Sequence, residues 1–478
     1  MKDIQDSNSL SAQIFPSSEQ FQKALIEVTK SLRSNQISQD PQILQQYGKD
    51  WLGQWEPLCR LVVWPESYED VQFLARWSYQ FEIPLIPSGG RTGLSGGATA
   101  RRGEVVVSFE RLNRILEFNP VNQTITCQAG TITQILHQQA LEKGFFFPIE
   151  FAAMGSSQLG GNVATNAGGL KVIRYGMMRD WVAGLKVVTA QGDLIDLNFP
   201  LVKDASGYDL KNLFIGTEGT LGMIVEVTVK VTQPPPPPQV LLLALESLSN
   251  ITPILLYLRK QASVSAFEFF SDLALDFVLE AGHVPALSLQ KSPYYVLIEL
   301  SGSDEAQVLS VFEHLFDQGW VNDGILSQST EQAQQLWKYR ELISESLAPH
   351  MPYKNDISVP IDSIERAVEK LQLTLKEHYP QFQIVQFGHI GDGNIHINIL
   401  KPKDMALDSF QKFCHQVDPL IFSVVQSFRG SLSAEHGVGI LKKPYLSYRR
   451  SALEINLMRQ IKAVFDPKGL LNPGKIFD

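Results

Sequence analysis

The sequence is poor in cysteine and has no long apolar run. Its 478 residues include only Cys59, Cys127 and Cys414, which are scattered and odd in number. This excludes a disulfide framework and a cysteine-rich zinc or iron–sulfur site, and it fits a reducing compartment. The longest apolar candidate, Val240–Leu245, has the length of a strand, whereas a membrane helix needs about 20 residues. We therefore expect no transmembrane segment.

Basic charge is also scarce. The chain carries 41 Lys and Arg residues against 50 Asp and Glu residues, a net charge of −9, which argues against a sequence-independent grip on nucleic acid. The N-terminus has acidic residues, no apolar core and no arginine before Arg33, so it is typical of neither a secretory signal nor a mitochondrial presequence. We expect a cytoplasmic protein that acts on small molecules or proteins, with peripheral membrane association left open.

The stretch Gly388–Asn398, which reads G-H-I-G-D-G-N-I-H-I-N, predicts a metal-binding hairpin. If Asp392-Gly393 forms a two-residue turn, His389 lies directly opposite His396. Opposed residues share a face with Cβ atoms about 5 Å apart, so both imidazoles can reach one ion, and Asn398 lies on the same face. The alternative is a pair of histidines on an exposed hairpin.

A carboxylate and a third imidazole follow in Ala434-Glu435-His436-Gly437. Two histidine nitrogens and one glutamate oxygen suit zinc, with manganese and iron as alternatives, and they leave room for a substrate. Neighbouring residues of a strand point to opposite faces, so we expect at most one of Glu435 and His436 to ligate the ion directly.

Two glycine-rich stretches predict a large bound cofactor. Residues 83–97 form an apolar strand that leads into five glycines in nine residues, a backbone that can turn successive N–H groups toward a pyrophosphate. Residues 155–169 hold five more glycines, so the backbone can approach a flat ligand closely. Polar contacts to that ligand would come from Ser157, Asn162, Thr165 and Asn166. The spacing is not the Rossmann fingerprint, and flexible loops are the alternative.

The rest of the chain alternates strands and helices. Apolar periodicity predicts a helix over Tyr68–Phe81 and a strand over Thr124–Gln128. The run Pro234–Pro238 can form neither a helix nor a central strand, so it marks a domain boundary. Beyond it we expect a mixed sheet covered by helices.

Five motifs in fixed order resemble a known family. Three of them resemble the FAD-binding domain of the vanillyl-alcohol oxidase and p-cresol methylhydroxylase (PCMH) superfamily. These three are P-L-I-P-S-G-G-R-T-G-L-S-G-G, G-S-S-Q-L-G-G-N-V-A-T-N-A-G-G and D-L-K-N-L-F-I-G-T-E-G-T-L-G. With G-H-I-G-D-G-N-I-H and A-E-H-G-V-G, the chain resembles the D-2-hydroxyacid dehydrogenase branch. That branch holds D-lactate dehydrogenases, D-2-hydroxyglutarate dehydrogenases and the FAD-linked subunit of glycolate oxidase.

The resemblance implies an α+β fold in four parts. We expect an N-terminal helical extension over 1–54 and a two-subdomain, PCMH-type FAD-binding domain over 55–233. A mixed α/β cap domain for the substrate would span 239–430 and carry the histidine hairpin. A C-terminal segment over 431–478 would return to the flavin domain and close the active site.

The resemblance also implies FAD. We expect noncovalent binding, because the first glycine loop contains no histidine to carry a covalent link. The implied flavin contacts come from the three glycine motifs, the strand after them and the C-terminal N-P-G-K-I-F ending. They are Pro87, Ser88, Gly89, Gly90, Arg91, Thr92, Gly93, Leu94, Ser95, Gly155, Ser156, Ser157, Gly160, Gly161, Asn162, Thr165, Asn166, Gly168, Gly169, Glu218, Gly219, Gly222, Ile224 and Asn472.

The implied active-site roles fall on the hairpin and its surroundings. His389, His396 and Glu435 would ligate the ion, and His436 would be the general base. Arg340 and Lys354 look like a clamp for a substrate carboxylate, although an isolated helical arginine more often faces solvent. Supporting contacts would come from Asn398 and from Ser344, which lies one helical turn after Arg340 and would face the same way.

The implied activity is oxidation of a D-2-hydroxy acid, with hydride transfer to the flavin and the hydroxyl proton taken by His436. D-Lactate is the first expectation, followed by glycolate and D-2-hydroxyglutarate. The electron acceptor stays open among a quinone, a cytochrome, an electron-transfer flavoprotein and a partner subunit, and a homodimer is one candidate assembly. Other readings are an oxidase or non-redox synthase on the same fold, a flavin-free metal hydrolase and a non-catalytic binding module.

A visible spectrum of the purified protein separates these classes. We expect bands near ~370 and ~450 nm, which are a property of the flavin itself. Acid precipitation should release all of the yellow colour, because the first glycine loop lacks a histidine. A colourless protein would point to the hydrolase, and colour retained in the precipitate would contradict noncovalent binding.

Overall fold

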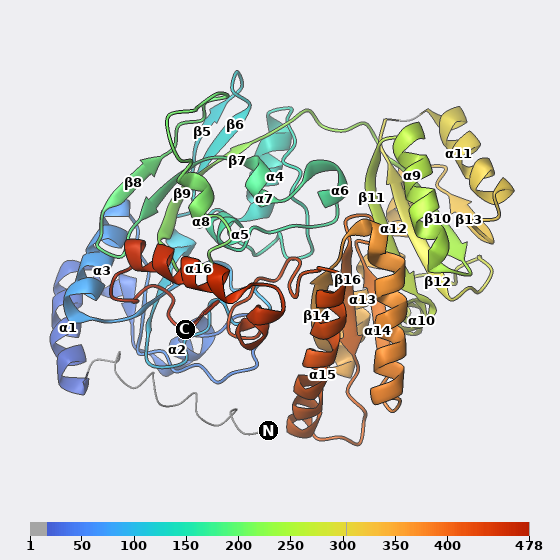
Figure 1. Cartoon of the computed structure of the whole chain (residues 1–478). Helices are drawn as coiled ribbons and strands as arrows, with labels where there is room; N and C mark the ends of the chain where they lie inside the picture. Colours follow the sequence, from blue (N-terminus) through green and yellow to red (C-terminus); the bar gives the residue numbers. More distant parts are fainter. Residues whose placement is uncertain (1–16, 303, 478) are drawn as a thin grey trace.

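The computed structural model describes residues 17–302 and 304–477, which form three sheets in two lobes (Figure 1). The first sixteen residues of the predicted N-terminal extension lie outside the described residues. Within the described part of the chain, no helix combines the length and apolar character needed to cross a membrane.

Two sheets build the first lobe. The four-stranded sheet has the order β1-β2-β4-β3 and consists of β1 (Ile37–Ser38), β2 (Leu61–Val63), β3 (Leu85–Ser88) and β4 (Val105–Ser108). The five-stranded antiparallel sheet has the order β5-β6-β9-β7-β8 and consists of β5 (Ile115–Asn119), β6 (Thr124–Gln128), β7 (Val182–Val188), β8 (Leu194–Leu197) and β9 (Met223–Lys230). The main helices of this lobe are α1 (Ser18–Ser31), α2 (Pro41–Tyr47), α3 (Tyr68–Phe81), α4 (Thr133–Glu142), α5 (Leu159–Thr165) and α6 (Val172–Tyr175).

Helix α3 shows how local sequence produces these elements. The Ser67 hydroxyl accepts the N–H of Asp70 and caps the helix, and apolar residues at helical spacing, including Val71 and Leu74, are buried against the lobe. A capped amphipathic segment is stable where its apolar face is covered. The predicted bounds of this helix and of β6 are confirmed.

A seven-stranded sheet forms the second lobe. Its order is β13-β10-β12-β11-β15-β16-β14, and its strands are β10 (Gln239–Leu245), β11 (Val264–Ser271), β12 (Tyr294–Leu300), β13 (Asp323–Leu326), β14 (Tyr353–Ser358), β15 (Ile384–Gly388) and β16 (Asn394–Ile399). All of its paired neighbours are antiparallel, so the expectation of a mixed sheet is wrong.

Helices cover the two faces of this sheet unequally. One face carries a continuous apolar core under α9 (Ile251–Gln261), α11 (Glu305–Asp317), α14 (Ile364–His378) and α15 (Leu407–Ser427). The other face is covered by α10 (Asp272–Glu280), α12 (Thr330–Glu341) and α13 (Ile343–Leu347). At β14, β15 and β16 this second face carries polar side chains, among them Asp356 and His396.

The C-terminal segment leaves the second lobe and returns to the first. Ser431 pairs with Ser358 of β14, and beyond it α16 (Ala452–Phe465) lies with the first lobe in Figure 1. Leu471 then forms a parallel bridge with Leu85 of β3. The α+β fold with a returning C-terminal segment is therefore confirmed.

The predicted hairpin forms with a different register. Phe387, and not His389, pairs with His396, and residues 389–393 make a five-residue connection. The reason is a competing hydrogen bond: the Gly391 N–H donates to the Phe267 carbonyl of β11, and the loop closes through Asn394 N–H to the His389 carbonyl. Even so, the rings of His389 and His396 lie 5.3 Å apart between centroids.

Candidate functional site

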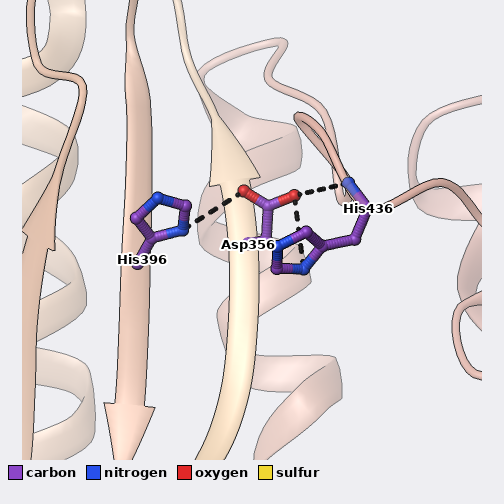
Figure 2. A group of neighbouring side chains, drawn as sticks. All are labelled: Asp356, His396 and His436. Atoms are coloured by element: carbon purple, nitrogen blue, oxygen red, sulfur yellow. Dashed lines mark hydrogen bonds and ion pairs between the residues drawn. The ribbon is translucent and has the colours of Figure 1, made fainter. Parts of the chain in front are cut away.

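A buried carboxylate, Asp356 of β14, organises the site (Figure 2). Its Oδ2 accepts the backbone N–H groups of Ala434, Glu435 and His436 at 3.1, 2.8 and 3.1 Å. Its Oδ1 lies 3.5 Å from His396 Nδ1, and its Oδ2 lies 3.7 Å from His436 Nδ1. Several N–H partners compensate the cost of burying this charge. Asp356 therefore ties the sheet to the C-terminal segment.

The same segment is held from the other lobe by Glu218. The Glu218 carboxylate accepts the N–H of Val438 at 2.7 Å and of Gly439 at 2.8 Å. Residues 434–436 consequently form a bend and not a strand, so the argument that Glu435 and His436 point to opposite faces of a strand is wrong. Both side chains lie in the site, near His389 and Asp356 respectively.

His389 has a carboxylate on each side. Glu268 of β11 lies 2.7 Å from its Nδ1, and Glu435 lies 3.6 Å from its Nε2. A histidine that donates Nδ1–H to a carboxylate presents Nε2 as an acceptor, which is the usual arrangement of a metal-ligating histidine. His389 is thereby oriented toward Glu435.

Two overlapping groups of side chains offer metal donors. One is the predicted set, His389, His396 and Glu435, whose donor atoms lie within 4.8 Å of one another. The other consists of Asp356, His396 and His436, within the same limit. The structure thus brings all four predicted residues together, and a nitrogen and oxygen donor set of this kind suits a divalent ion.

Burial and charge set the protonation of these groups. Burial lowers the pKa of His389, but Glu268 and Glu435 outweigh it and raise this pKa to about 9. Burial is the largest cause that raises the pKa of Glu435, and Asp356 and Glu268 add to it. Burial is likewise the largest cause that lowers the pKa of His396. Burial raises the pKa of Asp356, but His436 and His396 reverse the effect and leave it below its usual range. An ion at His389 and Glu435 would displace protons on binding.

The two residues of the predicted substrate clamp are buried or half-buried. Arg340 of α12 is buried: its Nη2 lies 2.8 Å from Glu268 Oε2, and its guanidinium stacks over Phe387 at 4.8 Å. Lys354 pairs with Asn398 across β14 and β16, which puts both on the face of Asp356. Burial lowers the pKa of Lys354, and among the described residues its side chain has no hydrogen bond or ion pair.

Ser344 does not share the orientation of Arg340. Helix α12 ends at Glu341 and α13 begins at Ile343, so the helical spacing is interrupted between the two residues. Ser344 is exposed, whereas Arg340 is buried. The expectation that Ser344 faces the clamp is therefore wrong.

The glycine stretches fit a large cofactor with polar edges. They touch each other: a Cβ on Gly90 would lie 2.1 Å from the Ser156 carbonyl oxygen. A Cβ on Gly161 would meet no described atom within 4 Å, so α5 presents an open face there. Buried polar atoms without a hydrogen-bond partner among the described residues gather around these stretches, namely Ser88 Oγ, Arg91 Nη1, Gln158 Oε1 and Asn472 Oδ1. A bound cofactor would satisfy such atoms.

The polar side chains of the second glycine stretch form hydrogen bonds within the protein. Asn162 donates to Thr133 Oγ1 at 2.6 Å, and Ser157 shares a 2.8 Å hydrogen bond with the same hydroxyl. Thr165 bonds back to its own helix, and Asn166 accepts the Arg179 N–H. These hydrogen bonds lie within the protein, and the ligand contacts expected of the four side chains stay a prediction.

The C-terminal ending completes the flavin side. Asn472 donates to the carbonyls of Gly97 at 2.9 Å and Glu218 at 2.6 Å, which places it between the first and third glycine motifs. Gly168 of the second stretch approaches the metal donors, because a Cβ there would lie 3.3 Å from Glu435 Oε1. The second glycine stretch and the candidate metal donors are therefore contiguous.

Sequence reasoning missed two residues, Asp356 and Glu268. Asp356 stands in the motif K-N-D-I-S-V-P beside the predicted clamp, and Glu268 interrupts the apolar strand A-F-E-F-F. For Glu268 the available signal was a lone carboxylate in a largely apolar strand, because such a charge is buried only with partners.

Comparisons with known proteins agree with this arrangement. A family described as FAD linked oxidases, C-terminal domain, matches residues 235–476, and one described as FAD binding domain matches residues 59–198. The chain is 50% identical to D-2-hydroxyglutarate dehydrogenase of Stutzerimonas stutzeri, with 95% of this chain and 99% of the relative covered. The protein of the same name from Xanthomonas citri pv. viticola is 49% identical, with 95% and 97% covered. Substrate-bound p-cresol methylhydroxylase shares the fold, with a TM-score of 0.78 at 15% identity over 97% of this chain and 98% of that one.

Replacing Asp356 by Asn should disable the site more than it destabilises the fold. The asparagine amide has N–H groups of its own, which cannot accept the backbone N–H groups of residues 434–436. We therefore expect a loss of about 1–3 kcal/mol in unfolding free energy. Turnover should fall by about 100-fold or more, because His436 loses the group that orients it. Thermal unfolding and steady-state turnover measure the two effects.

The matched control is Asp418→Asn. Asp418 is a buried carboxylate of α15 that lies against the opposite face of β14, where it accepts a hydrogen bond from the Tyr353 hydroxyl at 2.6 Å. It should cost similar stability while the folded enzyme keeps its turnover. Near-wild-type turnover of Asp356→Asn would contradict the importance of this carboxylate.

Proposed function

This chain belongs to the FAD-linked oxidases, in their D-2-hydroxyacid dehydrogenase branch, and we propose that it oxidises D-2-hydroxyglutarate to the 2-oxo acid with a divalent ion beside the flavin. The observation that carries the proposal is the junction of the two lobes, where metal donors, an imidazole base and the flavin-side glycines meet. The relatives named above, at 50% and 49% identity over almost the whole chain, support the choice of substrate.

We place D-2-hydroxyglutarate ahead of D-lactate, the first expectation from the sequence. The relatives' names favour it, and so does the charge around the site. Arg340 already has a counter-ion in Glu268, whereas Lys354 has none among the described residues. Arg340 Nε still lacks a hydrogen-bond partner among the described residues, so it can take the carboxylate beside the hydroxyl. A second carboxylate would then neutralise the half-buried Lys354, and D-lactate and glycolate have no second carboxylate. Glycolate and D-lactate remain the alternatives.

The proposed ion lies between His389, His396 and Glu435, with zinc first and manganese or iron as alternatives. This set is preferred over Asp356, His396 and His436, because the Asp356 oxygens already accept three backbone N–H groups and the Asn394 amide. A carboxylate so occupied is a weak further donor. His396 would serve through the edge turned away from Asp356.

The chemistry divides between the bound groups and the chain. FAD, when bound, accepts the Cα hydrogen as hydride, and a divalent ion, when bound, lowers the pKa of the substrate hydroxyl. His436 takes the hydroxyl proton, and Asp356 beside its ring stabilises the imidazolium that results. Lys354 and Arg340 orient the substrate carboxylates, and Asn398 adds a polar contact on the same face.

A substrate screen tests the function. With a dye acceptor, D-2-hydroxyglutarate should give the highest kcat/KM among D- and L-2-hydroxy acids. Chelation should lower turnover, and Zn²⁺ or Mn²⁺ should restore it, because hydroxyl deprotonation loses its Lewis acid. A higher kcat/KM for D-lactate would overturn the substrate assignment, and turnover unaffected by metal removal would overturn the metal.

His436→Ala tests the base. Loss of a general base typically costs about 10²–10⁴-fold in rate, so turnover should fall in that range while the flavin spectrum and metal content stay unchanged. His378→Ala, which changes an exposed histidine at the end of α14, is the control and should keep wild-type turnover. Full activity of His436→Ala would remove this residue from the mechanism.

A further inference from the structure

Glu268 is an unusual residue for its place in the fold. It lies in β11 between Phe267 and Phe269, near the middle of the seven-stranded sheet, and its exposed fraction is 0%. Taking a carboxylate out of water costs several kcal/mol unless it is paired. Its partners therefore indicate what it is retained for.

The two oxygens of Glu268 engage two different elements. Oε1 lies 2.7 Å from His389 Nδ1 in the hairpin connection, and Oε2 lies 2.8 Å from Arg340 Nη2 on α12. The contact with Arg340 is a close ion pair and not an aligned hydrogen bond. Neither partner is near Glu268 in sequence, so one side chain connects two distant segments.

The contact with His389 fixes which nitrogen keeps its hydrogen. A carboxylate 2.7 Å from Nδ1 holds the hydrogen there, so Nε2 is the nitrogen that gives up its proton when an ion binds. Nε2 is the nitrogen that faces Glu435, at 3.6 Å. Carboxylates that hold a ligating histidine in this way raise its basicity and set the plane of its ring.

The contact with Arg340 fixes the guanidinium. Glu268 holds one Nη atom, and the Phe387 ring lies under the plane at 4.8 Å. Arg340 Nε is buried without a hydrogen-bond partner among the described residues. The guanidinium is thus held in one orientation with donor capacity left, as an anion clamp requires.

We propose that Glu268 is a positioning residue that couples the metal site to the substrate clamp, holding His389 through Oε1 and Arg340 through Oε2. The inference rests on the proposed function, because it assigns Glu268 a task toward the ion and the substrate. A carboxylate with a purely structural role would stabilise the sheet but would affect neither ion binding nor substrate binding.

Glu268→Gln tests the coupling. A glutamine has one acceptor oxygen, so it cannot accept from both partners, and its amide N–H would favour the His389 tautomer with hydrogen on Nε2. Zn²⁺ affinity of the FAD-bound, metal-stripped protein, measured by competition with a chromophoric chelator, should fall by about 10–100-fold. KM for D-2-hydroxyglutarate at saturating Zn²⁺ should rise by about tenfold or more.

Glu299→Gln is the matched control. Glu299 is a buried carboxylate of the neighbouring strand β12 that accepts the Ser265 hydroxyl and the Trp337 N–H, outside the site. This variant should leave Zn²⁺ affinity and KM unchanged. Equal Zn²⁺ affinity in wild type and Glu268→Gln overturns the inference alone, whereas a wild type that binds no Zn²⁺ overturns the proposed metal site and the inference with it.

Arg340→Met separates the orientation of His389 from the loss of a counter-ion. In Glu268→Gln, Arg340 loses its carboxylate partner. Adding Arg340→Met removes that cation, so the double variant folds without an uncompensated buried charge. Zn²⁺ affinity of the double variant should remain as weak as in Glu268→Gln, because His389 still lacks its carboxylate acceptor. Arg340→Met alone should raise KM while its Zn²⁺ affinity stays at the wild-type value. Recovery of Zn²⁺ affinity in the double variant would contradict the proposal.

Discussion

The backbone N–H groups of residues 434–439 are the constraint on which the site depends. Five of them end on two buried carboxylates, Asp356 from the second lobe and Glu218 from the first. Hydrogen bonds to a carboxylate are stronger than neutral ones, and they offset the cost of burying the charge. The segment between the lobes is consequently held at both ends, and Glu435 and His436 are fixed where the sheet histidines meet the glycine stretches.

This arrangement places a carboxylate beside each imidazole. Glu268 faces Nδ1 of His389, and Asp356 faces Nδ1 of both His396 and His436. Carboxylates behind histidines set the tautomer and the ring plane, which is how proteins prepare ligands and bases before a substrate arrives. The flavin side contributes Glu218 and Asn472, so neither lobe contains a complete site.

Much of the fold follows from local sequence. Helix α3 and strand β6 have the predicted bounds, because their apolar residues repeat at one clear period. The candidate metal donors also lie together as expected, because they stand in two short motifs, and their role stays a prediction. The hairpin register and the hydrogen bonds of Asn162 depend on partners far along the chain, whereas the Ser344 orientation follows from the break between α12 and α13. Glu268 and His389 are 121 residues apart, and no local pattern predicts such a pair.

Anomalous diffraction at the zinc edge, from crystals of the FAD-bound protein grown with Zn²⁺, tests the central claim most directly. The account predicts one strong peak about 2.0–2.2 Å from His389 Nε2, a nitrogen of His396 and an oxygen of Glu435, next to Gly168 of the second glycine stretch. A peak among Asp356, His396 and His436, or no peak at the junction of the lobes, would contradict it.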